Sequence, residues 1–188
     1  YMTKRKPVMV INETYQHILW DMSLREGSAY NEEDAGDILG FHDFFDIIRP
    51  HWLPNYPRET FSAEIGSIFV KIVRTMHIPD SSWDWQSSFW SCGIIIDNRI
   101  LFTSDTRYDP ELVLSFDEMF NLEAIFLYFQ FFTGGVHASI EELKELPPAV
   151  KQKMYLTHYG DNWEDYEDKV REYGFGGLAE QQIHYVFD

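Results

Sequence analysis

The sequence has little cysteine and few basic residues, and each shortage excludes a class of protein. Cys92 is the only cysteine among 188 residues, so one chain can form neither an internal disulfide nor a zinc site built from cysteines. A single cysteine also fits a reducing compartment. The formal net charge of -16 repels polyanions, so we expect no long nucleic acid partner. A small nucleotide is not excluded, because a metal ion or an arginine can neutralise it locally.

Long apolar runs, internal repeats and low-complexity linkers are missing as well. The longest apolar runs, such as residues 126–132, are far too short to span a bilayer. The N-terminus is basic, but the apolar run that follows is broken at Asn12 and Glu13, so we predict no signal peptide. These absences predict a cytoplasmic protein without a membrane partner.

Apolar and aromatic residues are plentiful, which indicates a packed globular protein. They make up 45% and 17% of the chain, too much for a disordered protein. A length of 188 residues suffices for one domain with a sizeable core. We therefore expect a single domain over residues 1–188. An acidic, glycine-containing stretch and a proline- and tryptophan-rich loop predict a flap or insert at about 26–57.

Apolar periodicity predicts strands that alternate with short helices. Asp97-Asn98 is a strong two-residue hairpin turn, and Ser139 with Glu142 fits a helix capping box. The predicted strands are residues 8–11, 61–65, 66–75, 93–96, 100–103, 122–126, 154–157 and a closing edge strand at 183–187. The predicted helices are residues 14–25, 41–48, 165–173 and one that begins at Ser139, with helical turns at 110–114 and 115–119. Such alternation is typical of an α/β layered domain.

Asp105 is the first residue that could carry chemistry. It follows the predicted strand 100–103, between Ser104 and Thr106. A carboxylate in that place can bridge two divalent cations, while the neighbouring hydroxyls orient it. The same residue equally fits an Asx-turn or a helix cap, which aspartate often forms after a strand. The residue by itself leaves both alternatives open.

Three histidines occupy similar places. His77 and His158 each follow a predicted strand, and His137 follows Gly134-Gly135, where the backbone can approach a ligand closely. Neutral imidazole is a zinc ligand, and strand ends are where α/β domains place ligand groups. Each histidine alone also fits a surface or half-buried structural residue. Their joint occurrence with Asp105 favours a metal site.

Four short motifs resemble those of a known enzyme family. They are MHIP at 76–79, TSDTR at 103–107, GGVHAS at 134–139 and LTHYGD at 156–161. In this order they resemble the C-terminal two-thirds of a metallo-β-lactamase-fold phosphodiesterase of the tRNase Z-like branch. The nearest likeness is to the anti-Pycsar cyclic-nucleotide phosphodiesterases, which phages and bacterial relatives carry. The resemblance implies a layered αββα sandwich, of which this chain would form a partial version.

The resemblance also implies a site and a reaction. His77, Asp105 and His158 would be metal ligands, with Asp105 bridging two zinc ions, and His137 would be catalytic as a general acid at the phosphate or leaving oxygen. Two metals would polarise the phosphodiester of a small cyclic nucleotide and supply a hydroxide nucleophile. If a phage encodes the protein, the implied location is the host cytoplasm.

The sequence departs from the family pattern in two places. The His-x-His-x-Asp-His motif, which supplies most ligands of both metals, is missing, and a histidine–carboxylate pair is replaced by Leu127 and Tyr128. The remaining ligands could hold one partly open metal site, so we do not expect full two-metal hydrolysis from this chain alone.

The sequence leaves three alternative functions open. They are a phosphodiesterase completed by an upstream piece, a non-catalytic protein that sequesters a cyclic nucleotide, and a domain that binds a protein partner.

A partial domain of this fold has a further consequence. Without the first sheet, apolar faces of the helices and of the remaining sheet would be exposed. We therefore expect the chain to form a homodimer or to bind a complementary N-terminal fragment.

Overall fold

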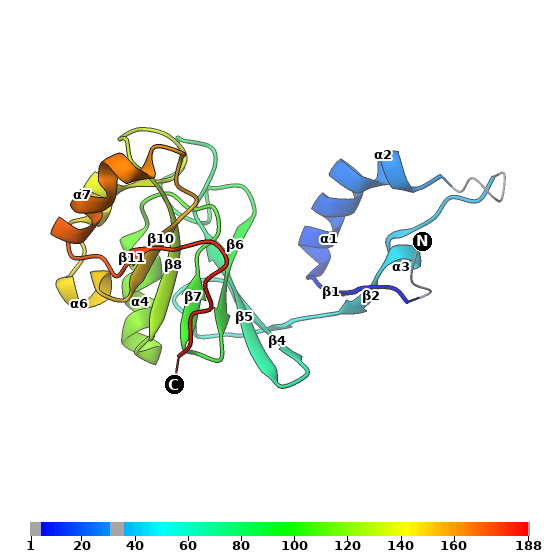
Figure 1. Ribbon diagram of the computed structural model, residues 1–188. Coiled ribbons are helices and arrows are strands. Elements are labelled where there is room, and N and C mark those ends of the chain that lie inside the picture. The colour runs from blue at the N-terminus through cyan, green and yellow to red at the C-terminus, as the bar shows by residue number, and fades with distance from the viewer. Residues whose placement is uncertain (1–4, 31–35, 188) are drawn as a thin grey trace. The chain divides into compact units, whose positions relative to one another are not determined.

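A computed structural model describes residues 5–30 and 36–187 and divides the chain into two compact units, Tyr1–Trp52 and Leu53–Asp188. Each unit has its own hydrophobic core, and Figure 1 shows the helices and strands of both units. The expectation of one domain over residues 1–188, with a flap at about 26–57, stays a prediction. Residues 31–35 of that flap lie outside the described residues.

The N-terminal unit combines a helical segment with a small parallel sheet. The helix begins at Asn12, whose side chain accepts a hydrogen bond from the Tyr15 amide at 2.7 Å. It runs on through a π-helical turn, and its apolar side packs into a core that includes Trp20 and Phe41. The elements are β1 (Val8–Val10), α1 (Glu13–Leu19), η1 (Trp20–Leu24), α2 (Arg25–Ser28), α3 (Phe41–Phe44), β2 (Asp46–Ile48) and β3 (His51–Trp52).

The predicted helix over residues 41–48 is wrong beyond its first turn. Only α3 is helical, and residues 46–48 form β2, which pairs in parallel with β1. The backbone N–H of Asp46 donates to the carbonyl of Pro7 at 3.0 Å. Pairing with a distant strand thus overrides the local helical spacing, and the β-branched Ile47 and Ile48 favour that outcome. The predicted helix over residues 14–25 is confirmed.

A twisted sheet forms the centre of the C-terminal unit. Its strand order is β11-β10-β8-β7-β6-β5-β4, and β9 pairs with β8. Strands β4 to β7 are antiparallel, whereas β7, β8, β10 and β11 are parallel. The strands are β4 (Thr60–Ile65), β5 (Ile68–Thr75), β6 (Ser91–Ile96), β7 (Ile100–Phe102), β8 (Ala124–Gln130), β9 (Ala138–Ser139), β10 (Met154–Thr157) and β11 (Gly177–Leu178).

The predicted hairpin between β6 and β7 is confirmed. Its two turn residues, Asp97 and Asn98, have φ angles of 51° and 59°, as a tight turn between twisted strands requires. Gly93 lets the two strands approach, because a Cβ there would lie 2.6 Å from the carbonyl oxygen of Phe102. This hairpin delivers the chain to Asp105.

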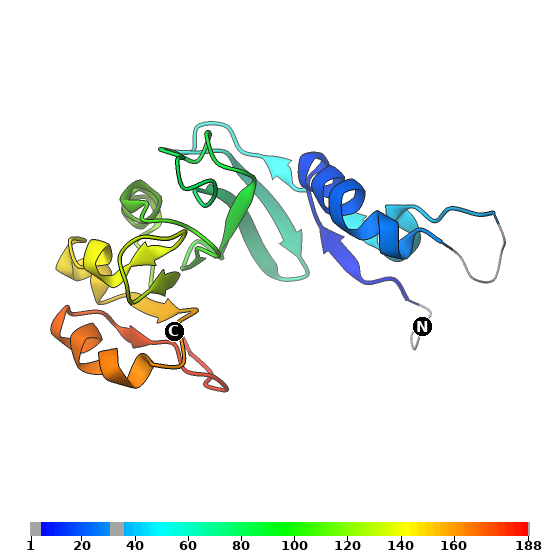
Figure 2. The same cartoon turned by 90° about the horizontal axis from the view of Figure 1, so that it is seen from above.

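Helices gather around the parallel strands and cover one face of the sheet (Figure 2). Their apolar residues pack against Ile95, Leu101 and Leu156, which are all fully buried. The two helical turns expected at 110–114 and 115–119 form one continuous helix. The helices are α4 (Pro110–Phe120), α5 (Ile140–Leu143), α6 (Pro148–Lys151), η2 (Trp163–Tyr166) and α7 (Glu167–Glu172). Within the described residues, no helix is long and apolar enough to cross a membrane.

The opposite face of the sheet carries an apolar row across neighbouring strands. Paired positions place Phe61, Ile72, Ile94, Phe102 and Phe126 side by side. Ile94 is 36% exposed, whereas Phe126 is 6% exposed. The mixed α/β class is confirmed, and the full αββα arrangement stays a prediction.

The C-terminal segment covers part of that face without forming a strand. The rings of Tyr185 and Phe187 pack edge-on against Phe126, at centroid distances of 5.3 and 6.5 Å. The predicted edge strand over residues 183–187 is therefore wrong. Aromatic packing, rather than backbone pairing, holds this segment.

Candidate metal centre

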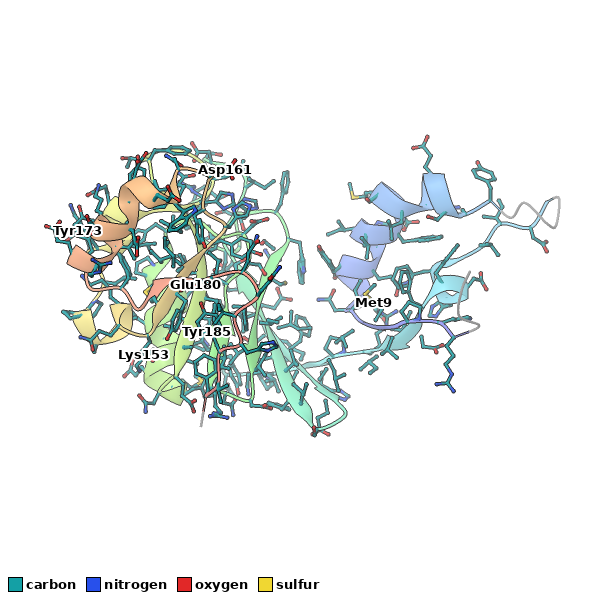
Figure 3. All side chains as sticks on the ribbon, viewed as in Figure 1. Met9, Lys153, Asp161, Tyr173, Glu180 and Tyr185 are labelled. Atoms are coloured by element: carbon teal, nitrogen blue, oxygen red, sulfur yellow. The ribbon has the colours of Figure 1, made fainter. Side chains whose placement is uncertain are left out.

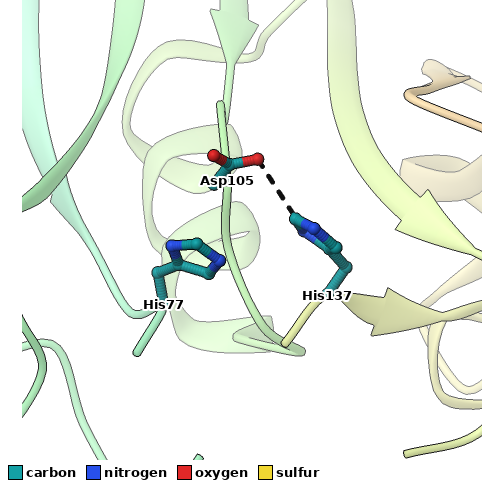
Figure 4. A group of neighbouring side chains, drawn as sticks. All are labelled: His77, Asp105 and His137. Atoms are coloured by element: carbon teal, nitrogen blue, oxygen red, sulfur yellow. Dashed lines mark ion pairs between the residues drawn. The ribbon is translucent and has the colours of Figure 1, made fainter. Parts of the chain in front are cut away.

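Three residues predicted to carry chemistry converge at one end of the sheet. Each of His77, Asp105 and His137 offers a donor atom, and these atoms all lie within 4.8 Å of one another (Figure 4). The Nδ1 atom of His137 lies 3.8 Å from Oδ1 of Asp105. The rings of His77 and His137 stack at a centroid distance of 5.3 Å. We call these three residues the donor group.

Hydrogen bonds between the neighbours of the three residues bring them together. Met76, which precedes His77, accepts at its carbonyl from the Arg107 amide at 2.7 Å and from the Thr106 hydroxyl at 3.1 Å. Thr106, which follows Asp105, accepts at its carbonyl from the Ala138 amide at 3.2 Å. Because Ala138 follows His137, these bonds tie all three chain segments to one another.

The backbone of Asp105 is fixed, and its carboxylate is left accessible. The hydroxyls of Ser91 and Thr75 donate to the Asp105 carbonyl oxygen at 3.0 and 3.3 Å. Ser104 adopts a φ of 53°, which turns the chain sharply at the strand end. The Asp105 side chain is 46% exposed. The sequence predicted that flanking hydroxyls orient the carboxylate, but Thr106 instead donates to backbone carbonyls.

The electrostatics of the donor group favour neutral imidazole at His137. Burial lowers the pKa of His137, as do nearby His158 and His77, while Asp105 opposes this by raising that pKa. A neutral ring leaves one nitrogen lone pair free to bind a cation.

The donor group meets the chemical requirements of a divalent-metal site. Within the described residues, His77 Nε2 and His137 Nδ1 are buried and have no hydrogen-bond partner, and buried polar atoms seldom lack one. Two ligand atoms on one tetrahedral zinc ion lie about 3.3 Å apart, so the observed 3.8 Å between His137 and Asp105 needs a small adjustment. Two histidines and one aspartate would hold zinc with a position open.

His158 lies beside the donor group but outside it. It follows β10 with a φ of 62°, and its ring centroid is 4.9 Å from that of His137. Its ring stacks in parallel on Tyr128 at 4.9 Å. The structure thus places His137, expected to be catalytic, among the donors, and places His158, expected to be a ligand, next to them. Both roles stay predictions.

Sequence reasoning missed the part played by Tyr128. That position and Leu127 were interpreted only as a lost histidine–carboxylate pair. Side chains alternate along β8, so Leu127 points into the core at 2% exposure and Tyr128 points to the other face, under His158. The alternating pattern of a strand could have indicated this.

A hollow of about 1090 Å³ is lined in part by His158. Its walls come from β10, β11, α7 and the C-terminal segment, and Figure 3 labels Asp161, Glu180 and Tyr185 among its residues. The hydroxyl of Tyr159 donates to the Ala179 carbonyl at 2.7 Å and braces one wall. The volume is of the size that binds small molecules.

Comparison with known proteins supplies the family. The sequence model of the family described as Anti-Pycsar protein Apyc1 matches residues 1–185. The chain belongs to this family. It is 31% identical over 182 residues to Anti-Pycsar protein Apyc1 of Paenibacillus harenae, covering 96% of this chain and 66% of that protein. It is 30% identical over 171 residues to the protein of the same name from Bacillus phage BSP38, covering 88% of this chain and 61% of that protein.

The resemblance seen in four motifs is therefore confirmed at the level of the anti-Pycsar family. The chain spans 66% and 61% of the length of these two relatives.

Proposed function

We propose that this chain is part of a metal-dependent phosphodiesterase that hydrolyses cyclic nucleotides, on a metallo-β-lactamase-like fold of the tRNase Z-like branch. The convergence of His77, Asp105 and His137 is the observation that carries the proposal. Membership of a family named for opposing Pycsar supports a role in which a phage protein removes a cyclic nucleotide signal of host defence.

The residues of the donor group and His158 have separate roles in the proposed reaction. Zinc bound at the donor group would polarise the phosphodiester and supply the nucleophile. His77 and Asp105 would hold the metal, and the lowered pKa of His137 suits a third, neutral ligand. His158 lies beside His137 and is one of the residues that line the hollow, where it can donate a proton to the leaving oxygen.

The proposed site needs more donors than the donor group offers. A second metal requires ligands from another segment, and the chain spans only part of the length of its relatives. The partly exposed apolar row on the sheet supports a second copy of the chain or a complementary N-terminal fragment as the partner that completes the site.

Metal analysis and a panel of cyclic nucleotides test this function on the full assembly. We expect zinc in the purified protein and hydrolysis of at least one cyclic nucleotide. Asp105→Ala should lose the metal and reduce activity by at least about a hundredfold, because the metal supplies most of the rate enhancement. Asp168→Ala is the matched control, since that side chain is 98% exposed on α7. An assembly that hydrolyses cyclic nucleotides without any metal would contradict the proposal.

A sequestering protein is the second candidate. Leu127 is buried in the core and the ring of Tyr128 packs on His158, so neither position supplies the histidine–carboxylate pair of the family pattern. A nucleotide held in the hollow would then stay intact. Calorimetry of the Asp105→Ala variant with cyclic UMP and cyclic CMP distinguishes the two, because sequestration predicts binding heat that does not depend on metal. No heat from either nucleotide would exclude sequestration of these two signals.

A further inference from the structure

The last residue of β8 holds the loop that leads to His137. The Gln130 side chain is buried, with the residue 9% exposed. Its Nε2 donates to the carbonyl oxygens of Phe132 and Gly134 at 3.0 and 2.8 Å. Residues 132–135 are themselves exposed, so this one buried amide anchors a segment that has little packing of its own.

Gly135 lets the amide and the loop lie in direct contact. A Cβ at Gly135 would lie 2.9 Å from both Nε2 and Oε1 of Gln130, so the Gln130 amide would have to move away from its present place. Gly135 also has a φ of 134°, a conformation that favours glycine. A side chain at position 135 would therefore displace the amide that anchors the loop.

The far end of the loop is anchored next to Asp105. The Ala138 amide donates to the Thr106 carbonyl at 3.2 Å, and β9 pairs with β8 at Gln130 and Ser139. Val136 and His137 are thus held between two fixed points. Metal ligands and catalytic groups must be placed to within about 0.5 Å, so both anchors affect the position of the His137 imidazole.

We propose that Gln130 is a positioning residue for His137 and keeps its imidazole within the donor group. The inference rests on the proposed metal-dependent function of that group. An amide suits the position, because its NH₂ supplies two donors for two carbonyls, whereas a carboxylate has acceptors alone. Gln130 occupies the same face of β8 as Tyr128, two residues earlier, which supports the ring of His158. One strand end therefore supports both histidines.

The test is Gln130→Glu, which keeps the side-chain size and replaces the donor by an oxygen that faces two carbonyls. In ¹⁵N spectra of the metal-free chain we expect the imidazole signals of His137 to shift or broaden, while those of His17, His42 and His184 stay in place. Zinc affinity should fall about 10- to 100-fold, as it does when residues behind a ligand are altered. Gln152→Glu makes the same chemical change at an exposed position and should change neither quantity.

Unchanged His137 signals in Gln130→Glu would overturn the proposal, and so would unchanged zinc affinity. Movement of all histidine signals together, with a lower melting temperature, would also overturn it by showing a purely structural role. Should the wild-type chain bind no zinc, the proposed function fails, and the metal-free spectra still decide the role of Gln130.

Discussion

At the scale of single residues, Cys92 carries the only thiol of the sequence, and its surroundings make it unreactive. Burial raises the pKa of Cys92 to about 11, although the neighbouring Arg74 guanidinium acts to lower it. Arg74 is itself buried, and its guanidinium lies 4.1 Å from the ring centroid of Trp90. The cation thus contacts an aromatic ring and backbone carbonyls, and burial outweighs its effect on the sulfur.

We expect Cys92 to resist alkylation in the folded protein. A thiol pKa of about 11 against an ordinary 9.0 leaves roughly a hundredfold less thiolate at pH 8, and the thiolate is the nucleophile. Iodoacetamide labelling followed by mass spectrometry should therefore be at least about a hundredfold slower in the native chain than in denaturant. Equal rates in the two states would show that Cys92 is accessible and ionisable.

At the scale of elements, a buried ion pair joins the segment before β4 to the start of α4. Arg58 donates to Asp109 at 2.7 and 3.2 Å, and their side chains are 0% and 9% exposed. Asp109 also caps α4 by accepting from the Leu112 amide at 3.1 Å. One carboxylate therefore stabilises both a helix end and a buried cation.

Breaking this pair should be costly. Arg58→Met leaves the Asp109 carboxylate buried without its partner, which typically costs about 3–5 kcal/mol of the free energy of unfolding. Urea denaturation measures the change. Arg171→Met is the control, because that side chain is 72% exposed and pairs on the surface, where pairs contribute about 0–1 kcal/mol. Equal effects of the two substitutions would contradict the buried-pair interpretation.

Helices α5 and α7 are joined by a second charged cluster that responds to acid. The Glu141 carboxylate accepts from Lys144, Lys169 and Tyr173, and its bonds to Lys144 and Lys169 lower its pKa from 4.5 to about 2. The carboxyl group of Glu141 thus binds a proton less tightly in the folded state than in the unfolded state. The cluster therefore stabilises the fold above pH 4.5, and this contribution is lost as the pH falls toward 2.

We expect Glu141→Gln to lower the melting temperature at pH 7 and to have a smaller effect as the pH falls from 4.5 toward 2. Thermal melts of the variant and of wild type at each pH in that range measure the difference in melting temperature. Glu164→Gln, which lies on an exposed part of η2, serves as the control. A difference between Glu141→Gln and wild type that stays constant down to pH 2 would show that the charge of Glu141 does not stabilise the fold.

At the scale of the whole molecule, one face of the C-terminal sheet is incompletely covered. Helices bury one side, while the rings of Tyr185 and Phe187 pack over the Phe126 end of the apolar row and Ile94 in that row is 36% exposed. An apolar surface of this kind usually marks an interaction site.

The chain should therefore associate in solution. We expect light scattering to report a dimer, or a complex when an N-terminal fragment of the family is supplied. Replacing Ile94, which is 36% exposed on the open face, by aspartate should shift the population toward monomer. Ile183→Asp, on the exposed C-terminal segment, is the control. A monodisperse monomer of the wild-type chain would refute association.

The sequence by itself determined the local features and the family. The hairpin turn at Asp97-Asn98 and the capping box at Ser139 depend on neighbouring residues, and both appear as predicted. The four motifs likewise indicated the family that the comparison confirms. Local steric preference and short-range hydrogen bonding act within a few residues, so they can be read from the sequence.

Only the tertiary structure decided which residues meet. The strand β2 in place of a helix, and the packing of Tyr185 on Phe126, both depend on partners far along the chain. The same is true of the donor group, where bonds among segments about thirty residues apart place His137, rather than His158, with His77 and Asp105. Spacing in the sequence cannot determine such contacts, because they follow from strand pairing and backbone hydrogen bonds between distant segments.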